Sequence, residues 1–309
     1  MLEVAKLRIF SHTMSRKPDF STFAKKRQMF QLTFRDKKII FDRPTVMGIL
    51  NVTPDSFSDG GCYNQIDKAL QHCEQLLSDG ADIIDIGGCS TRPNNAIATE
   101  SEELERVVPI LKAIRKAFPD TLISIDTFRK NVAEACVNEG ADLINDISGG
   151  LFDAEMLPYI GKNHIPYVLM HCVGTPETMH QYTLSGTIHQ TVMDFFEQQC
   201  KTLKAYGDPQ IILDPGIGFG KSLEANYQLL NDLERYRYNH LPILIGISRK
   251  SLIFKVLGTT PQAAENGTTV LNTIALLNGA DILRVHDVKN AREAIELVGT
   301  FRQSIGKTL

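Results

Sequence analysis

Eight short apolar segments recur along the chain, and each is followed by polar or charged residues or by a glycine-rich loop. The segments cover residues 46–50, 82–86, 122–125, 143–144, 165–170, 211–213, 243–247 and 282–283. Residues between them follow helical spacing or form long loops. Strands that alternate with helices predict an α/β fold with a parallel sheet, and eight of them predict a (β/α)₈ TIM barrel. An open doubly wound sheet is the alternative, although no dinucleotide-type glycine fingerprint opens its first βα unit.

Two local patterns support the barrel. Gly-Ala-Asp occurs at residues 80–82, 140–142 and 279–281, each time between a helical segment and an apolar strand. Glycine ends a helix well in a left-handed conformation, so the motif predicts one αβ connection used three times. Before the first barrel strand, residues 30–34 and 39–41 flank a polar turn. This predicts an N-terminal β-hairpin that covers the bottom of the barrel.

Composition narrows the functional classes. The chain has 309 residues, a net charge of −3 and 43% hydrophobic residues. This length fits one large α/β domain or two smaller ones. The charge gives no basic field for nucleic acid or an anionic membrane, and no apolar run reaches the length of a membrane span. The six cysteines form no C-x-x-C pair. We expect reduced thiols in a cytoplasmic protein.

The first 28 residues differ from the rest because they carry seven Lys and Arg against two acidic residues. A targeting peptide is one interpretation, but acidic residues and poor apolar continuity argue against it. We expect a basic surface extension over 1–28, or translation from Met14 or Met29 instead. The domain boundary is therefore placed before residue 29, with the barrel over 29–309.

The stretch from Met47 to Gly61 changes character within a few residues. It begins as a buried strand, in which Gly48 allows a close approach, and continues from Asn51 as a polar, glycine-containing loop. An ordinary βα connection needs fewer polar groups than this loop contains. The alternative is a simple loop with capping residues.

The strand ends supply a constellation of polar side chains, which a barrel would gather on one face. Its members are Asn51, Thr91, Arg92, Asp126, Asn145, His171, Asp214, Lys250, Arg284 and His286. Asp126, Asn145 and Asp214 suit a flat, nitrogen-rich heterocycle, because carboxylates and amides can pair with ring N–H and amine groups. Arg284 and His286, beside Asn51, suit a phosphate-like anion or its metal.

Each of these residues also has a structural interpretation. Asp126 or Asp214 could cap the following helix, and Arg284 could pair with Asp287. His171 is more often structural than a ligand. The glycine-rich segment 216–221 is a weak phosphate-loop signal and matches no Walker pattern. Lys250 precedes an expected helix whose free N–H groups would favour anions.

Seven motifs, in order, resemble those of the dihydropteroate synthase family. They are residues 47–61, 86–93, 124–127, 144–147, 213–221, 246–251 and 284–287. The resemblance runs from about residue 30 to the end. It implies a pterin-binding barrel that condenses 6-hydroxymethyl-7,8-dihydropterin diphosphate with p-aminobenzoate, giving 7,8-dihydropteroate and pyrophosphate. Such an enzyme is a transferase of folate biosynthesis and a sulfonamide target, is commonly a homodimer and uses Mg²⁺.

The resemblance also implies roles for individual residues. Asp126, Asn145, Met170, Asp214 and Lys250 would bind the pterin. Asn51, Arg284 and His286 would bind the diphosphate, with Asn51 on Mg²⁺. Thr91, Arg92, Pro93, Phe219 and Ser251 would line the p-aminobenzoate site. Asp59 would lie on the first loop and, with Asp126, Asp214, Lys250 and Arg284, take part in catalysis.

A dissociative, SN1-like substitution is the mechanistic hypothesis: carboxylates stabilise a cationic pterin methylene as pyrophosphate leaves. The sequence departs from the family at Cys89, where the family usually has Glu. Two alternatives stay open. One is a methyltetrahydrofolate-binding methyltransferase, which needs no diphosphate site. The other is a non-catalytic pterin-binding paralogue, which only Cys89 favours.

Overall fold

The computed structural model describes residues 30–34, 37–53, 62–89, 97–175, 178, 184 and 186–304. The strands are β1 (Phe30–Phe34), β2 (Lys37–Phe41), β3 (Thr45–Asn51), β4 (Ile83–Gly87), β5 (Leu122–Asp126), β6 (Leu143–Asp146), β7 (Tyr167–Met170), β8 (Ile211–Asp214), β9 (Leu244–Ile245) and β10 (Ile282–Val285). The helices are α1 (Cys62–Ser78), α2 (Glu100–Ala117), α3 (Lys130–Asn138), α4 (Met156–Lys162), α5 (Ile188–Tyr206), α6 (Leu223–Asn231), α7 (Ser251–Phe254), α8 (Glu265–Leu277) and α9 (Val288–Ser304), with 3₁₀ turns η3 (Leu233–Tyr236) and η4 (Tyr238–His240). No helix in these ranges is long and apolar enough to cross a membrane.

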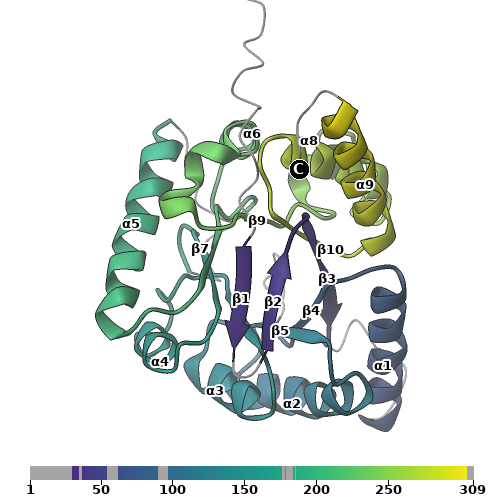
Figure 1. Cartoon of the computed structure of the whole chain (residues 1–309), viewed down its shortest axis with the longest axis vertical. Helices are drawn as coiled ribbons and strands as arrows, with labels where there is room; N and C mark the ends of the chain where they lie inside the picture. Colours follow the sequence, from purple (N-terminus) through teal and green to yellow (C-terminus); the bar gives the residue numbers. More distant parts are fainter. Residues whose placement is uncertain are drawn as a thin grey trace, which may run out of the picture.

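Eight parallel strands form the barrel, in the order β8-β7-β6-β5-β4-β3-β10-β9. The two edge strands meet through a parallel bridge between Leu213 and Ile243, and the Leu213 N–H donates to the Pro242 carbonyl at 2.8 Å. Helices surround the strands (Figure 1). The predicted (β/α)₈ barrel is therefore confirmed, and the open doubly wound sheet is excluded.

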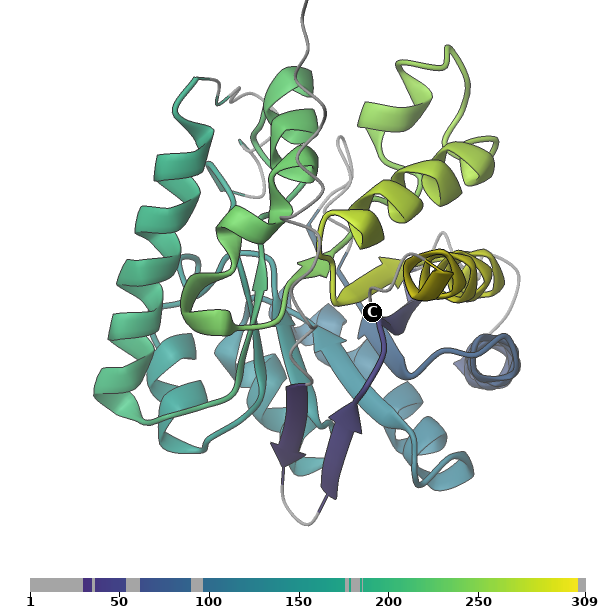
Figure 2. The same cartoon turned by 45° about the horizontal axis from the view of Figure 1, so that its top comes forward.

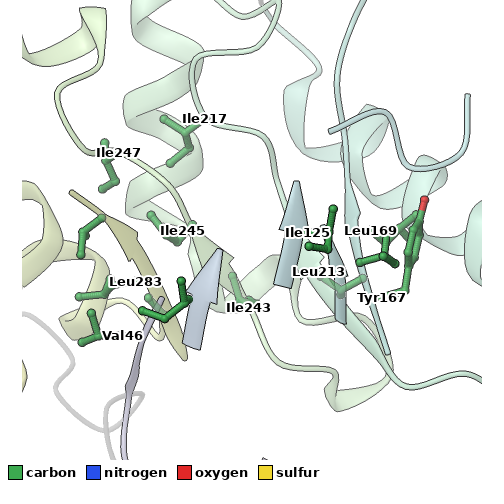
Figure 3. Packing of buried hydrophobic residues seen from close by; sticks show 14 of the residues in the cluster. Val46, Ile125, Tyr167, Leu169, Leu213, Ile217, Ile243, Ile245, Ile247 and Leu283 are labelled. Atoms are coloured by element: carbon green, nitrogen blue, oxygen red, sulfur yellow. The ribbon is translucent and has the colours of Figure 1, made fainter. Parts of the chain in front are cut away.

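Alternation along the strands divides the core into an inside and an outside. One apolar residue from every barrel strand forms an inner floor, which comprises Met47, Ile83, Leu122, Leu143, Val168, Ile212, Leu244 and Ile282. Their sequence neighbours belong to the larger outer cluster that includes helix residues. Figure 3 shows part of that outer layer, including Val46, Ile125, Leu169 and Leu283.

The predicted hairpin is β1–β2, paired antiparallel from Phe30–Phe41 to Phe34–Lys37. Leu32 and Phe41 are buried in the same cluster as the floor residues. The hairpin therefore closes the amino end of the barrel, below the strands in Figure 2. Burial of these side chains removes the floor from water.

The three Gly-Ala-Asp joins form one repeated contact, which we call the Gly-Asp clasp. In the second copy, Oδ2 of Asp142 accepts hydrogen bonds from the Ile123 N–H (3.0 Å) and from Nη2 of Arg115 (2.5 Å). Arg115 also donates to the Gly140 carbonyl (2.7 Å). Equivalent groups are Asp82, Val46, Arg292 and Gly80 in the first copy, and Asp281, Ile243, Arg237 and Gly279 in the third. Each clasp ties the start of one strand to the preceding strand.

Local differences from the predicted elements are small. Strand β9 covers only Leu244–Ile245, because the chain from Gly246 to Lys250 turns away instead of extending the ladder. Gly48 has the predicted close neighbours: a Cβ there would lie 3.2 Å from Val288 and 3.3 Å from Ala81. The barrel and its connections thus follow the hydrophobic pattern closely.

Candidate active site

A ring of four polar residues lies one step above the floor. Two residues beyond Ile83, Leu143, Ile212 and Ile282 stand Asp85, Asn145, Asp214 and Arg284, in β4, β6, β8 and β10. These are alternate strands of the barrel, and alternate strands contribute side chains to the same interior layer. We call these four residues the polar ring. Three were predicted as site residues, and Asp85 was missed.

Asp85 occupies the centre of the contacts in the polar ring. Its Oδ2 accepts hydrogen bonds from Nε of Arg284 (2.6 Å) and from Nδ2 of Asn145 (3.0 Å). Its side chain is fully buried, and its Oδ1 has no hydrogen-bond partner. The clue in the sequence was an aspartate between two isoleucines, two residues past an apolar strand start. A buried carboxylate in such a position needs cationic or N–H partners.

Arg284 also holds Asp126, and the predicted alternative pair with Asp287 is wrong. Nη2 of Arg284 lies 2.6 Å from Oδ2 of Asp126, and both side chains are one-fifth exposed. Burial raises the pKa of Asp126 to about 7. The positive charge of Arg284 opposes this shift, and the negative charge of Asp85 adds to it. Burial lowers the pKa of Arg284, but Asp85 and Asp126 outweigh it and raise that pKa overall. Asp126 caps no helix: α3 follows Arg129, without a side-chain cap.

Asn51 ends β3 as predicted and lies near Asp126. A Cβ placed on Gly87 would be 3.7 Å from Oδ1 of Asn51 and 3.6 Å from Oδ2 of Asp126. The missing side chain at Gly87 therefore leaves space between an amide oxygen and a carboxylate oxygen. Mg²⁺ favours such oxygen ligands, completed by water and substrate phosphate. The two residues fit an Mg²⁺ ion by their chemistry.

Asp214, Lys250 and Phe219 form the other side of the site. Burial raises the pKa of Asp214, while Lys250 opposes this shift. Burial lowers the pKa of Lys250 to about 8. Nζ of Lys250 lies 4.2 Å from the centre of the Phe219 ring and donates to the Ile217 carbonyl. Asp214 accepts the Gly216 N–H at 2.7 Å, which is a turn contact and not a helix cap.

The glycine-rich segment 216–221 is held by its own lysine. Nζ of Lys221 donates to the carbonyls of His171 (3.1 Å), Gly216 (2.7 Å) and Phe219 (3.1 Å). Burial lowers the pKa of Lys221 to about 7. The lysine is thus occupied within the loop, and the weak phosphate-loop interpretation gains no support. By holding the loop, Lys221 keeps Phe219 beside Lys250.

His286 is positioned by Ser248. Its Nδ1 lies 2.9 Å from Oγ of Ser248, which also accepts the His286 N–H at 3.2 Å. Between Ser248 and Lys250, Arg249 takes a positive φ of 57° and pairs with both carboxylate oxygens of Asp287. Helix α7, which follows, has four residues. Such a single turn has too few aligned peptides for a substantial dipole, so we do not retain it as an anion site.

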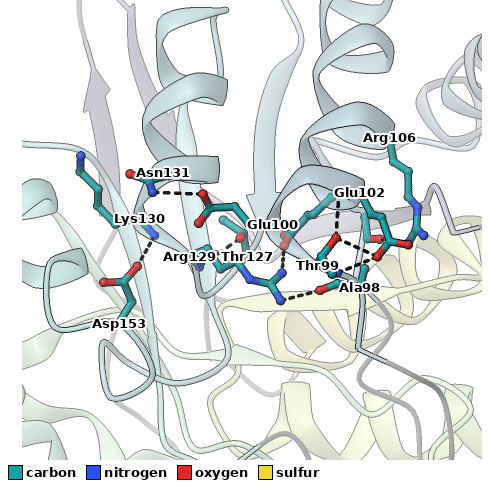
Figure 4. Close-up of polar contacts among 12 residues, drawn as sticks. Ala98, Thr99, Glu100, Glu102, Arg106, Thr127, Arg129, Lys130, Asn131 and Asp153 are labelled. Carbon is teal, nitrogen blue, oxygen red and sulfur yellow. Dashed lines mark hydrogen bonds and ion pairs between the residues drawn. The ribbon is translucent and has the colours of Figure 1, made fainter.

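Cys89 lies near a buried ion pair, at the start of the loop that follows β4, which we call the second loop. Burial raises the pKa of the Cys89 thiol, and the negative charge of Glu103 adds to this effect. Glu103 is fully buried and pairs with Arg129, which also donates to the Ala98 carbonyl at 2.5 Å. Figure 4 shows the Arg129 contacts beside the Thr99–Glu102 capping box of α2. A carboxylate thus lies close to Cys89, contributed by α2.

The remaining predicted site residues are unevenly placed. Asp59, Thr91, Arg92 and Pro93 lie outside the described residues. Met170 is buried and packs with Phe219 in a small apolar cluster, whereas Ser251 is exposed. His171 is buried, and burial lowers its pKa to about 3. Its ring meets Phe195 edge-on at 5.1 Å, as expected of a structural histidine.

Comparisons with known proteins identify the family of this chain. The pterin binding enzyme family matches residues 47–286. The dihydropteroate synthase of Streptococcus pyogenes serotype M6 is 41% identical over 266 residues, covering 85% of this chain and 97% of that protein. The crystal structure of Yersinia pestis dihydropteroate synthase with a sulfonamide drug complex has a TM-score of 0.82 and 43% identity, covering 89% of this chain and 100% of that one. The structure of Xanthomonas albilineans dihydropteroate synthase with 4-aminobenzoic acid has a TM-score of 0.79 and 35% identity, covering 89% of this chain and 98% of that one.

The family match, the barrel and the polar ring define a pterin-binding enzyme. Within that class, the chain belongs to the dihydropteroate synthase family, whose members act in folate biosynthesis.

Proposed function

We propose that this enzyme condenses 6-hydroxymethyl-7,8-dihydropterin diphosphate with p-aminobenzoate, releasing pyrophosphate and 7,8-dihydropteroate. The observation that carries the proposal is the polar ring with Asp126 and Lys250 beside it. It combines acceptors and donors for a pterin with a largely buried arginine for an anion. Family membership and the relatives named above support the same reaction.

Pterin recognition is assigned to Asp126, Asn145, Asp214 and Lys250. Carboxylates accept from the ring N–H and amine groups, whereas Lys250 and the amide of Asn145 donate to ring acceptors. Met170 supplies apolar contact for the ring face. Asn145 and Asp214 are buried, and Asp126 and Lys250 are partly buried, so a bound pterin would exchange water for fixed hydrogen bonds at little cost in reorganisation.

Diphosphate recognition is assigned to Asn51, Arg284 and His286. Asp85 fixes Arg284 through its Nε, and phosphate oxygens would bind the terminal nitrogens of Arg284 in place of the Nη2 contact with Asp126. We assign an Mg²⁺ ion to Asn51, together with the diphosphate. When bound, the ion would neutralise the charge that develops on departing pyrophosphate.

The p-aminobenzoate site is assigned to Phe219 and Ser251, with Thr91, Arg92 and Pro93 from the second loop. Lys221 holds the backbone carbonyl of Phe219, and Lys250 lies over the Phe219 ring. Sulfonamides would compete at this site. Cys89 is compatible with the assignment, because Glu103 and Arg129 keep a buried ion pair at the loop base.

The chemistry is assigned to a dissociative substitution. The C–O bond between the pterin methylene and the diphosphate breaks first, and the electron pair leaves with pyrophosphate. Asp126 and Asp214, with Asp59 from the first loop, stabilise the remaining cation. The aromatic amine is neutral at pH 7, so it attacks without a strong general base and loses its proton afterwards.

We further assign a homodimer and a cytoplasmic location. Leu297 and Phe301 on α9 are 71% and 55% exposed, and Val270 and Ile274 are exposed on the neighbouring α8. A second copy covering them would remove an apolar surface from water. Sedimentation of the wild type and of Leu297→Asp tests this, since a monomeric wild type would contradict it.

Five free cysteines among the described residues support the assigned cytoplasmic location, which is a reducing compartment.

The decisive experiment mixes purified protein, Mg²⁺, the dihydropterin diphosphate and p-aminobenzoate, and measures both products. Equal amounts of pyrophosphate and dihydropteroate over many turnovers are expected. Pterin binding without either product would instead support the non-catalytic paralogue. Methyl transfer from methyltetrahydrofolate, without pyrophosphate release, would support the methyltransferase.

A further inference from the structure

We propose that Asp85 is the positioning residue of the active site, holding the groups for diphosphate and for pterin at once. It touches no assigned substrate position, and this inference rests on the function proposed above. Its single oxygen Oδ2 accepts from both Arg284 and Asn145. The two partners belong to different parts of the substrate site, so one carboxylate fixes their relative placement.

The strand order explains why Asp85 can reach both partners. Strand β4 lies two places from β10, with β3 between them, and two places from β6, with β5 between them. The partners therefore flank Asp85 on opposite sides within one interior layer. Residues beside it in the ladder are Ile49 and Ser124, neither of which carries charge. Asp85 is the residue of the polar ring that joins its two sides.

Asp85 and Asp126 divide the work of holding Arg284. The Asp85 side chain is fully buried, whereas that of Asp126 is one-fifth exposed at the end of its strand. Asp85 holds Nε, next to the stem of the side chain, and Asp126 holds the terminal Nη2. The contact with Asp85 is thus the permanent one. The contact with Asp126 is the one that a diphosphate can replace, which would release Asp126 to the pterin.

The unused oxygen of Asp85 provides a sharp test. Because Oδ1 has no hydrogen-bond partner, Asp85→Asn can place its oxygen at the position of Oδ2 and keep both contacts. Asp85→Ala removes both, as does Asp85→Ser, whose hydroxyl is too short to reach two partners. Asp142→Ala is the matched control, because it breaks another buried carboxylate–arginine pair at the opposite end of the barrel.

Steady-state kinetics should be measured for all variants on the folded fraction. We expect Asp85→Ala to lose about 100-fold in kcat/KM for the dihydropterin diphosphate, the usual cost of misplacing a binding group. The KM for p-aminobenzoate should not change. Asp85→Asn should recover most of the loss, and Asp142→Ala should keep wild-type kcat/KM. If Asp85→Ala does not fold, Asp85→Ser carries the same expectation.

Three results would overturn the inference. The first is an Asp85→Ala or Asp85→Ser enzyme that loses no more kcat/KM than Asp142→Ala. The second is an Asp85→Asn enzyme as impaired as Asp85→Ala. The third is a parallel rise of KM for both substrates in Asp85→Ala, which indicates general loosening of the barrel. A wild type that makes no dihydropteroate would contradict the proposed function itself, and so the two failures are distinguishable.

Discussion

Nη2 of Arg284 lies 2.6 Å from Oδ2 of Asp126, a contact that joins the assigned anion site to the assigned pterin site. In the proposed reaction, Asp126 matters most when positive charge develops on the pterin. Asp126→Asn keeps the shape of the side chain and removes its charge. We expect kcat to fall roughly 100-fold or more, with a much smaller loss of pterin affinity. Single-turnover rates and pterin titrations measure the two effects, and equal losses would contradict the dissociative mechanism.

Pterin should bind tightly only over a narrow range of pH. Burial raises the pKa of Asp126 to about 7, so its carboxylate becomes protonated below that pH and no longer accepts a ring N–H. Burial lowers the pKa of Lys250 to about 8, so its ammonium is lost above that pH. Affinity for a pterin without diphosphate should therefore decline about tenfold per pH unit on either side. Binding titrations of the pterin at several pH values test this. If the Asp126→Asn variant still lost affinity at low pH, a group other than Asp126 would be responsible for that loss.

Gly216 is expected to be irreplaceable. Its φ is +69°, and a Cβ there would lie 1.8 Å from the His171 carbonyl oxygen. Gly216→Ala should destabilise the protein by roughly 3 kcal/mol or more, through strain and a backbone clash. Gly258→Ala is the matched control, since its φ is +60° with open space around it. It should cost only about 1–2 kcal/mol, as measured by urea unfolding. Equal costs would mean that the loop relaxes.

The Gly-Asp clasp should contribute stability without affecting turnover. Arg115→Ala leaves the buried Asp142 carboxylate without its cation, which should cost about 3–5 kcal/mol. Lys112 lies on the same helix as Arg115 and forms an exposed pair with Glu139 at the end of α3, so Lys112→Ala should cost at most about 1 kcal/mol. Urea unfolding and kcat/KM on folded protein are the measurements. A loss of turnover in Arg115→Ala would show that the two ends of the barrel are coupled.

The fold was predictable because its signals are local. Apolar runs, helical spacing and three copies of Gly-Ala-Asp identify strands, helices and joins without any long-range knowledge. The end of β9 was less predictable, since residues 246–250 remain apolar or turn-forming whether or not they pair. Its early end depends on the Ser248–His286 contact and the positive φ of Arg249, which are tertiary features.

The site was predictable where a polar residue ended a strand, as at Asn51, Asp126 and Asp214. Partners could not be predicted, because pairing depends on strand order. The sequence suggested Asp287, three residues away, as a partner of Arg284, whereas its partners are Asp85 and Asp126. Asp85 was missed because it lies within a strand. Counting two residues from the apolar floor would have identified it.

The Asp85–Arg284 bond joins residues 199 positions apart, and the Asp85–Asn145 bond spans another 60. A chain that ends before β10 can therefore contain no working substrate site, since β10 is the last strand within the described residues. Pterin binding should begin only when the whole ring of strands has closed. A bound pterin analogue would then report completion of folding, and ligands in the cell would select complete, closed molecules over truncated ones.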